Sequence, residues 1–261
     1  MSEASANAVL AYSIDGPQDA PPVVMGSSLG TTREMWAPNL AALSEFRVIR
    51  YDHLGHGESE VPPRPYTMEQ LAAGVLHLLD SLGIDKAAYV GLSLGGAVGQ
   101  WLAINAPERI SSLALLCTAA QFPPPESWLE RAELVRAEGT GAFAETAMGR
   151  WFTEGFRERH PEQIQQWMSM VNGVPDEGYA GCCEALATYD VRQQLGTIAA
   201  PTLALAGADD PSTGPDDLRF IADRIPGARL EVVDDAAHLA NVEQADAVNR
   251  LLVEHLRDGG R

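Results

Sequence analysis

The feature that most constrains the fold of this 261-residue chain is the alternation of short strand-type runs with helical patterns. The clearest helical pattern covers residues 68–82, where Leu and Val recur at spacings of three and four after a capping box of Thr67 and Gln70. Such alternation predicts an α/β fold, with a mostly parallel central sheet flanked by helices. Right-handed crossovers place the carboxyl ends of the strands, and with them the active site, along one edge of the sheet. The expected strands cover residues 22–25, 47–51, 87–91, 112–117, 202–206 and 229–233.

The alternation stops between residues 121 and 196. The prolines of 123–125 open this segment, and strand character returns after Pro201. An insertion of about 75 residues inside a compact domain is usually a functional lid. We therefore expect a core formed by residues 1–120 and 197–261, into which an all-helical cap, defined as residues 121–196, is inserted. The helical patterns of the cap cover residues 126–138, 141–152, 161–171 and 176–187.

Composition narrows the class of protein. The chain carries 36 acidic and 18 basic side chains, a formal net charge of −18. That balance argues against nucleic acid, which needs a basic footprint, and against an anionic membrane surface. Residues 1–6 lack the charged and apolar regions of a secretory signal, and the apolar runs fall short of the roughly 20 residues of a membrane span. Three cysteines, two of them adjacent, do not suggest a disulfide framework. We predict a cytoplasmic enzyme, whose oligomeric state the sequence does not indicate.

The sharpest chemical signal is Gly91-Leu92-Ser93-Leu94-Gly95, which has the G-x-S-x-G spacing. It follows the expected strand at 87–91 and precedes a helix-forming stretch at 97–105, the context in which this motif carries a nucleophile. The glycines permit a strained turn that projects the serine hydroxyl. We therefore predict Ser93 as the nucleophile. The alternative is a Gly-rich turn with a solvated serine.

A serine hydroxyl becomes a good nucleophile only when a base removes its proton. In this arrangement the order along the chain is Ser, acid, His, which favours His238, just after the strand at 229–233. The strand at 202–206 runs into Asp209 and Asp210, and only one of these can face the imidazole. The other is then a turn residue or a solvated carboxylate. Three other histidines, His77, His160 and His255, fall within helical patterns.

An oxyanion hole needs two backbone donors. One is the amide of Leu94, and the best-placed second donor is the amide of Ser28 in the Gly/Ser-rich loop at 26–30, which is otherwise an ordinary turn. Residues 51–59 are dense in Gly and His, but the spacing of His53 and His56 matches no zinc signature. We interpret that segment as a structural turn and predict no metal site.

With these residues in place, the chain resembles the α/β-hydrolase superfamily and, more narrowly, is similar to the 3-oxoadipate enol-lactonases of bacterial aromatic-acid catabolism. The similarity covers nearly the whole chain, and its motifs in the cap discriminate most, because generic hydrolases vary there. It favours Asp210 as the acid, three residues after Gly207. The motifs are Ser27-Ser28-Leu29-Gly30-Thr31, Arg50-Tyr51-Asp52, Gly55-His56-Gly57, Pro65-Tyr66-Thr67, Arg150-Trp151-Phe152-Thr153, Gly178-Tyr179-Ala180, Cys182-Cys183-Glu184-Ala185 and Ala237-His238-Leu239-x-Asn241-Val242-Glu243-Gln244.

Two positions depart from the pattern of that family. Leu54 stands where members often carry an arginine before Gly-His-Gly, and Gly214 stands where a proline is common. If the arginine helps to hold an anionic substrate, this chain must hold it with other residues.

The resemblance implies a serine hydrolase that opens a carboxymethyl enol-lactone to 3-oxoadipate through an acyl-enzyme, with no cofactor. The substrate is then a small anionic lactone. Competing interpretations are another ester, lactone or carbon–carbon bond hydrolase of this fold, or a catalytically silent ligand receptor. Cap residues that are candidates to contact the substrate, and that are otherwise core aromatics or solvated arginines, are Trp128, Arg131, Arg150, Trp151 and Tyr179.

Overall fold

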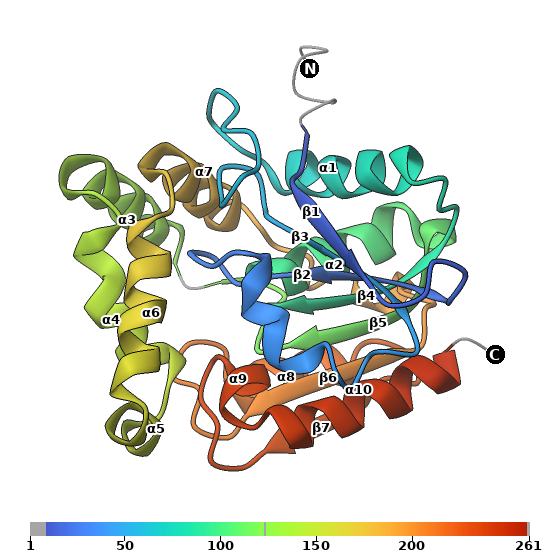
Figure 1. Ribbon diagram of the computed structural model, residues 1–261. Helices are drawn as coiled ribbons and strands as arrows, with labels where there is room; N and C mark the ends of the chain where they lie inside the picture. The colour runs from blue at the N-terminus through green and yellow to red at the C-terminus, as the bar shows by residue number, and fades with distance from the viewer. Residues whose placement is uncertain (1–8, 123, 260–261) are drawn as a thin grey trace.

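The computed structural model describes residues 9–122 and 124–259 (Figure 1). Residues 1–6, which lack the features of a secretory signal, and Pro123 lie outside the described residues. Within these ranges the strands form one seven-stranded sheet in the order β1-β3-β2-β4-β5-β6-β7. Only β1 runs antiparallel to its neighbour, so the predicted mostly parallel α/β sheet is confirmed. The strands are β1 (Tyr12–Asp15), β2 (Pro22–Gly26), β3 (Arg47–Tyr51), β4 (Ala87–Leu92), β5 (Ile110–Leu116), β6 (Thr202–Gly207) and β7 (Arg229–Val233).

The first strand is the one that the sequence analysis missed. It is four residues long and lies at the edge of the sheet, where Tyr12 and Ile14 remain 42% and 41% exposed. A half-buried edge strand of that length has too few alternating positions to produce a pattern, and only its pairing with β3 defines it.

Helices cover both faces of the sheet because successive strand residues point to opposite sides. On one face, Val24 and its neighbours pack against α1 (Met68–Ser81), α2 (Leu94–Asn105) and α8 (Pro215–Ala222). On the other face, Val23 packs with α10 (Ala245–Gly259) and the 3-10 helix η2 (Arg33–Asn39). The capping box before α1 is confirmed, since the backbone amide of Thr67 donates to Gln70 Oε1 at 2.9 Å and the Gln70 amide donates to Thr67 Oγ1 at 3.2 Å. The remaining short elements are η3 (Pro107–Arg109) and α9 (Ala240–Glu243) in the core and η4 (Leu195–Thr197) at the boundary between cap and core.

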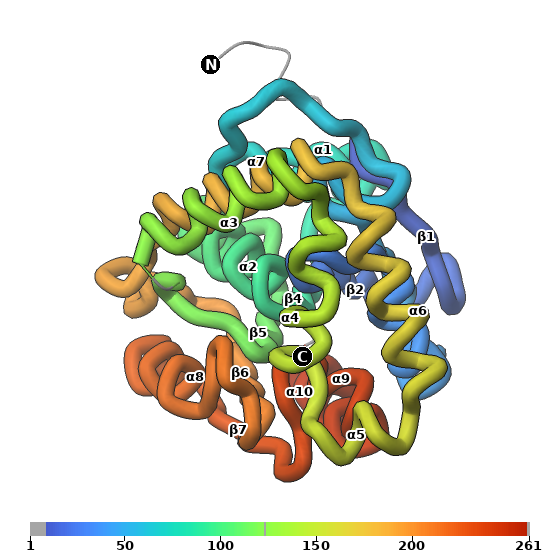
Figure 2. The backbone as a smooth tube through the Cα atoms, turned by 90° about the vertical axis from the view of Figure 1, so that its left-hand side faces the viewer, coloured from blue at the N-terminus to red at the C-terminus, as the bar shows by residue number. Residues whose placement is uncertain are grey.

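The segment between β5 and β6 is helical in its described part. It contains one short helix that the sequence analysis did not anticipate, α5, because six residues are too few for a helical periodicity to show. In Figure 2, which looks onto the cap, α4 lies in front of β4 and α2. The limits of the core and the cap themselves stay a prediction. The cap helices are α3 (Pro125–Glu138), α4 (Gly141–Trp151), α5 (Glu154–Arg159), α6 (Pro161–Asn172) and α7 (Asp176–Ala187).

The backbone of the cap helix α7 packs closely against the backbone of the core at Gly55. A β-carbon built at Gly178 in α7 would lie 2.0 Å from the carbonyl oxygen of Gly55, which itself has a positive φ of 73°. Glycine is therefore required at both positions. No helix in the described ranges combines the length and the apolar character needed to cross a membrane.

We expect Gly178→Ala to lower the free energy of unfolding by about 1–3 kcal/mol, because the added methyl must push α7 away from Gly55. Gly149→Ala, in α4, is the matched control. Its β-carbon would meet nothing within 4 Å, so the better helix propensity of alanine should raise stability by about 0.5–1 kcal/mol. Urea unfolding measures the free energy of unfolding of both variants, which should fall in Gly178→Ala and rise in Gly149→Ala. Equal effects would contradict the close contact.

Candidate active site

Ser93 occupies a sharp turn between β4 and α2. Its backbone has φ 56° and ψ −114°, a left-handed conformation that costs a non-glycine residue about 1–3 kcal/mol. The neighbours must be small for this turn to close. A β-carbon at Gly91 would lie 2.3 Å from the carbonyl oxygen of Gly95, and one at Gly95 would lie 2.2 Å from that of Gly26. The hydroxyl of Thr118 donates to the Ser93 carbonyl oxygen at 2.8 Å and helps to hold the turn.

His238 and Asp210 lie together at the carboxyl ends of β7 and β6. Nδ1 of His238 is 2.8 Å from Oδ2 of Asp210. The amides of Ser212 and Thr213 donate to Oδ1 at 2.8 and 3.3 Å, and the Thr213 hydroxyl donates to Oδ2 at 3.1 Å. Burial alone would raise the pKa of Asp210, but attraction to His238, its hydrogen bond and the two amides together hold that pKa below its ordinary value. The geometry thus supplies an ionised carboxylate that orients the imidazole.

Asp209 does not share this arrangement. Its side chain is exposed, and its backbone amide donates to the carbonyl oxygen of Ala236 at 2.9 Å. Of the two adjacent aspartates, the structure therefore brings Asp210 to His238 and turns Asp209 toward solvent. Thr213, whose hydroxyl also lies 3.3 Å from His238 Nδ1, is a further contributor that the sequence analysis did not identify.

The predicted oxyanion donors lie next to the serine. The amide of Gly95 donates to the Ser27 carbonyl oxygen at 3.0 Å, which ties the loop after β2 to the turn at Ser93. Among the described residues, neither the Ser28 amide nor the Leu94 amide has a protein acceptor. Both amides are thus free to donate to an oxygen held at Ser93, and Leu94 begins α2, whose dipole adds positive potential there. Their catalytic role stays a prediction.

His53 and His56 form hydrogen bonds to residues 26–30, the loop after β2 that carries the Ser28 amide. The sequence analysis did not predict these contacts. Nε2 of His53 lies 2.9 Å from the Ser27 carbonyl oxygen, and the Gly30 amide donates to Nε2 of His56 at 3.0 Å. Burial lowers the pKa of His53 to about 3, assisted by His56, and burial lowers the pKa of His56 to about 4. Both imidazoles are therefore neutral near pH 7. The only signal in the sequence was their place after β3, the strand that neighbours β2.

The described residues hold no group of three or more His, Cys, Asp or Glu side chains arranged for a metal ion. Leu54, at the position where the resemblance implies an arginine, is buried beneath the cap, where its carbonyl oxygen lies 3.6 Å from the Cys182 thiol. The three cysteines are buried and free.

A cavity of about 420 Å³ is lined both by Ser93 and His238 and by residues of the cap. Ser28, Ser93 and His238 line it from the core, and every cap residue that the sequence analysis put forward lines it from above. No hydrogen bond joins the Ser93 hydroxyl to His238 among the described residues, and such bonds often tighten only with substrate bound. The cap residues are Trp128, Arg131, Arg150, Trp151 and Tyr179.

The two cap arginines differ in their surroundings. The guanidinium of Arg131 lies 4.4 Å from the ring centre of Trp128 and 4.9 Å from that of Phe143, and it is partly buried. Arg150 is exposed. Within the described part of the chain, neither arginine has an acidic partner at ion-pair distance. The cavity thus contains unneutralised positive charge in an otherwise acidic protein.

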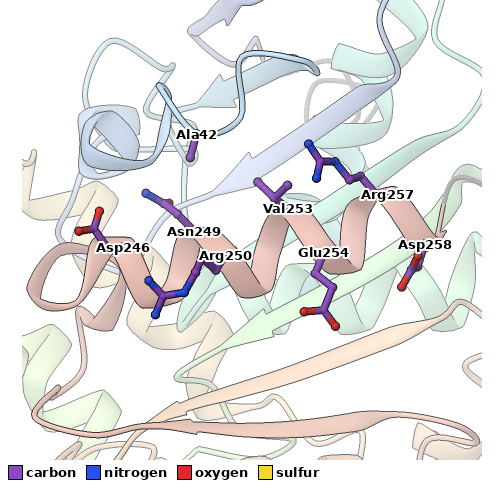
Figure 3. Close-up of a pocket in the computed structure, with 8 residues that line it drawn as sticks. All are labelled: Ala42, Asp246, Asn249, Arg250, Val253, Glu254, Arg257 and Asp258. Atoms are coloured by element: carbon purple, nitrogen blue, oxygen red, sulfur yellow. The ribbon is translucent and has the colours of Figure 1, made fainter.

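A larger hollow of about 550 Å³ lies along the outer side of α10 (Figure 3). It is shallow, and its polar groups are side chains of one surface helix, without a nucleophile beside a base. The smaller cavity at Ser93 is therefore the candidate active site. The outer hollow is lined by Ala42, Asp246, Asn249, Arg250, Val253, Glu254, Arg257 and Asp258.

Known proteins resemble this chain over nearly its full length. Residues 21–245 match the family described as alpha/beta hydrolase fold. The chain is 44% identical over 241 residues to 3-oxoadipate enol-lactonase 2 of Acinetobacter baylyi, covering 92% of this chain and 90% of that protein. It is 39% identical over 238 residues to 3-oxoadipate enol-lactonase 1 of the same organism, covering 91% and 89%. The crystal structure of the enol-lactonase from Burkholderia xenovorans LB400 superposes with a TM-score of 0.93 at 43% identity, covering 95% and 96%.

Replacing each aspartate separately tests which one is the acid. Asp210→Asn removes the charge that stabilises the imidazolium, and we expect kcat to fall by about 10³- to 10⁴-fold. Asp209→Asn, its exposed neighbour, should stay within about twofold of the parent, because a surface carboxylate contributes little. Steady-state kinetics on an aryl acetate measures both. The assignment is wrong if the Asp209 variant is the inactive one.

The buried histidines make stability depend on pH. The unfolded chain protonates His56 below its ordinary pKa of about 6.5, whereas the folded chain resists protonation down to about 4. The stability that His56 contributes is thus complete above pH 6.5 and is lost as the pH falls to 4, by about 3 kcal/mol. In His56→Gln, whose amide oxygen can still accept from Gly30, urea unfolding between pH 7.5 and 4.5 should show a shallower loss. Parallel losses in both proteins would contradict this.

Proposed function

This chain belongs to the α/β-hydrolase fold family and, within it, to the 3-oxoadipate enol-lactonases, and from that premise we propose that it hydrolyses 3-oxoadipate enol-lactone to 3-oxoadipate. The observation that carries the proposal is a single cavity that joins Ser93 and the Asp210–His238 pair to the unpaired guanidinium of Arg131. An ester-cleaving apparatus thus faces a site for an anion.

The reaction proceeds in two steps. His238 takes the proton of the Ser93 hydroxyl as its oxygen attacks the lactone carbonyl carbon, and the amides of Ser28 and Leu94 donate to the resulting oxyanion. Collapse of this intermediate breaks the ring bond between the acyl carbon and the enol oxygen. The leaving group is an enolate, which takes the proton held by His238 and relaxes to a ketone, so that His238 is again neutral. Water, deprotonated by His238, then attacks the acyl-enzyme and releases the second carboxylate together with free Ser93.

Recognition of the substrate carboxylate falls to Arg131 in this proposal. Its stacking between Trp128 and Phe143 presets the orientation of the guanidinium, which reduces the entropy lost on binding. The indole N–H of Trp128 is buried without an acceptor among the described residues. Arg150, being exposed, is the secondary candidate.

Two aromatic cap residues form the wall for the lactone ring. A β-carbon at Gly30 would lie 3.2 Å from Tyr179 and 3.6 Å from Trp151, so both rings sit directly over the loop that carries the Ser28 amide. The substrate is then confined between this wall and Ser93. A cytoplasmic location, part of the same proposal, agrees with three free cysteines, since such thiols persist in a reducing compartment.

The proposal is tested by comparing substrates. We expect kcat/KM for 3-oxoadipate enol-lactone to exceed that for p-nitrophenyl acetate, and Arg131→Met to lower the former by about 10- to 100-fold, mainly through KM, because a charge-assisted hydrogen bond is lost. The aryl acetate has no carboxylate, so its hydrolysis by Arg131→Met should change by less than about threefold.

Three controls define the outcome. Ser93→Ala should abolish both reactions and the labelling by a fluorophosphonate probe, which separates an enzyme from a ligand receptor. Arg192→Met removes an exposed arginine paired with Asp190 and should leave both reactions unchanged. Equal or better activity on the aryl acetate would refute the lactonase function, and a larger effect of Arg150→Met would transfer the carboxylate site to Arg150.

A further inference from the structure

Glu243, the last residue of α9, links the loop that carries His238 to the cap. Its Oε1 accepts two hydrogen bonds from Thr153, one from the backbone amide at 3.0 Å and one from the hydroxyl at 2.7 Å. Its Oε2 accepts the backbone amide of Ala237 at 2.6 Å. Ala237 directly precedes His238, and Thr153 begins α5, which lies beside α9 in Figure 2. One carboxylate therefore joins two segments that are far apart in the sequence.

A second bond ties the other side of the histidine to the cap. The amide of Leu239 donates to the carbonyl oxygen of Trp151 at 3.0 Å. The backbone after His238 is thus bonded directly to the cap at Trp151, and the backbone before it is linked to Thr153 through Glu243. Trp151 itself lines the candidate active-site cavity. Among the described residues, the imidazole ring of His238 is hydrogen-bonded only at Nδ1, which lies 2.8 Å from Asp210 Oδ2 and 3.3 Å from the Thr213 hydroxyl. The direction of the other ring nitrogen, Nε2, therefore depends on the backbone of residues 237–239.

We infer that Glu243 is a positioning residue, which holds His238 in register with Ser93 and the cap. This inference rests on the proposed roles of Ser93 and His238. Both carboxylate oxygens accept, and every contact is an N–H or O–H donor, so a glutamine in this place would direct its NH₂ group against a donor.

The position of Glu243 has no better explanation in local stability. Among the described residues, no Lys, Arg or His lies within ion-pair distance of Glu243. The three hydrogen bonds to the His238 loop and to Thr153 are what this carboxylate provides.

The test is Glu243→Gln, assayed well below its melting temperature with p-nitrophenyl acetate and with a small fluorophosphonate. We expect kcat to fall by about 10- to 100-fold with KM within about threefold, because a displaced base slows proton transfer without altering the cavity wall. Labelling of Ser93 should slow by a similar factor. Glu45→Gln, which removes an exposed carboxylate paired with Arg257 on α10 (Figure 3), is the matched control and should keep the parent values.

Several outcomes decide the matter. Parent-like kcat in Glu243→Gln, or a rise in KM alone, overturns the inference. If that variant does not fold, Thr153→Val removes the hydroxyl that donates to Glu243, together with its capping bond from the Phe156 amide, and keeps the backbone amide donor. We then expect kcat to fall by about 3- to 10-fold, and an unchanged kcat overturns the inference. A chain that hydrolyses the aryl acetate but not the enol-lactone refutes the lactonase function and leaves Glu243 in its role. A parent chain that the probe does not label refutes the catalytic triad and the inference with it.

Discussion

The strained turn at Ser93 is the constraint on which the rest of the structure depends. It closes only because Gly91 and Gly95 lack β-carbons and because β2 lies next to β4, so that Gly26 can approach the turn. Because β2 is next to β4, the loop that follows β2 also brings Ser28 close to Ser93. Because β3 is on the other side of β2, His53 and His56 reach that loop and form hydrogen bonds to it. On the other side, β6 and β7 bring Asp210 and His238 to the same edge of the sheet. One strand order thus assembles the whole catalytic edge.

The cap completes the site and contacts the core at several places. At Gly55 and Gly178 two backbones touch, and at Glu243 a carboxylate joins the His238 loop to Thr153. The cap also carries the positive charge of the cavity. A chain with a net charge of −18 repels an anion at long range, so the recognition of an anionic lactone that we propose has to be local. The guanidinium stacked on aromatic rings and the oriented amides are the groups proposed for it.

Much of the fold and of the candidate site could be predicted from the sequence, and the misses have physical causes. The central strands β2, β4, β5 and β6 are mostly apolar and buried, so the sequence indicated where they lie. The strand β1 and the helix α5 are too short for a periodicity to develop, and tertiary contacts define them. The Gly/His-rich segment was interpreted as a turn, but hydrogen bonds from His53 and His56 to a neighbouring loop do not follow from spacing along the chain.

The sequence by itself determined the α/β architecture, the serine turn and the identity of the histidine and acid candidates, because glycine spacing and apolar periodicity are local properties. Only the tertiary structure decided between Asp209 and Asp210 on contact grounds, since adjacent residues after a strand point in different directions and one of them must meet His238. It also separated Arg131 from Arg150 by burial and stacking, and it revealed Glu243. Those distinctions depend on which distant segments share a cavity, and that is set by packing rather than by sequence order.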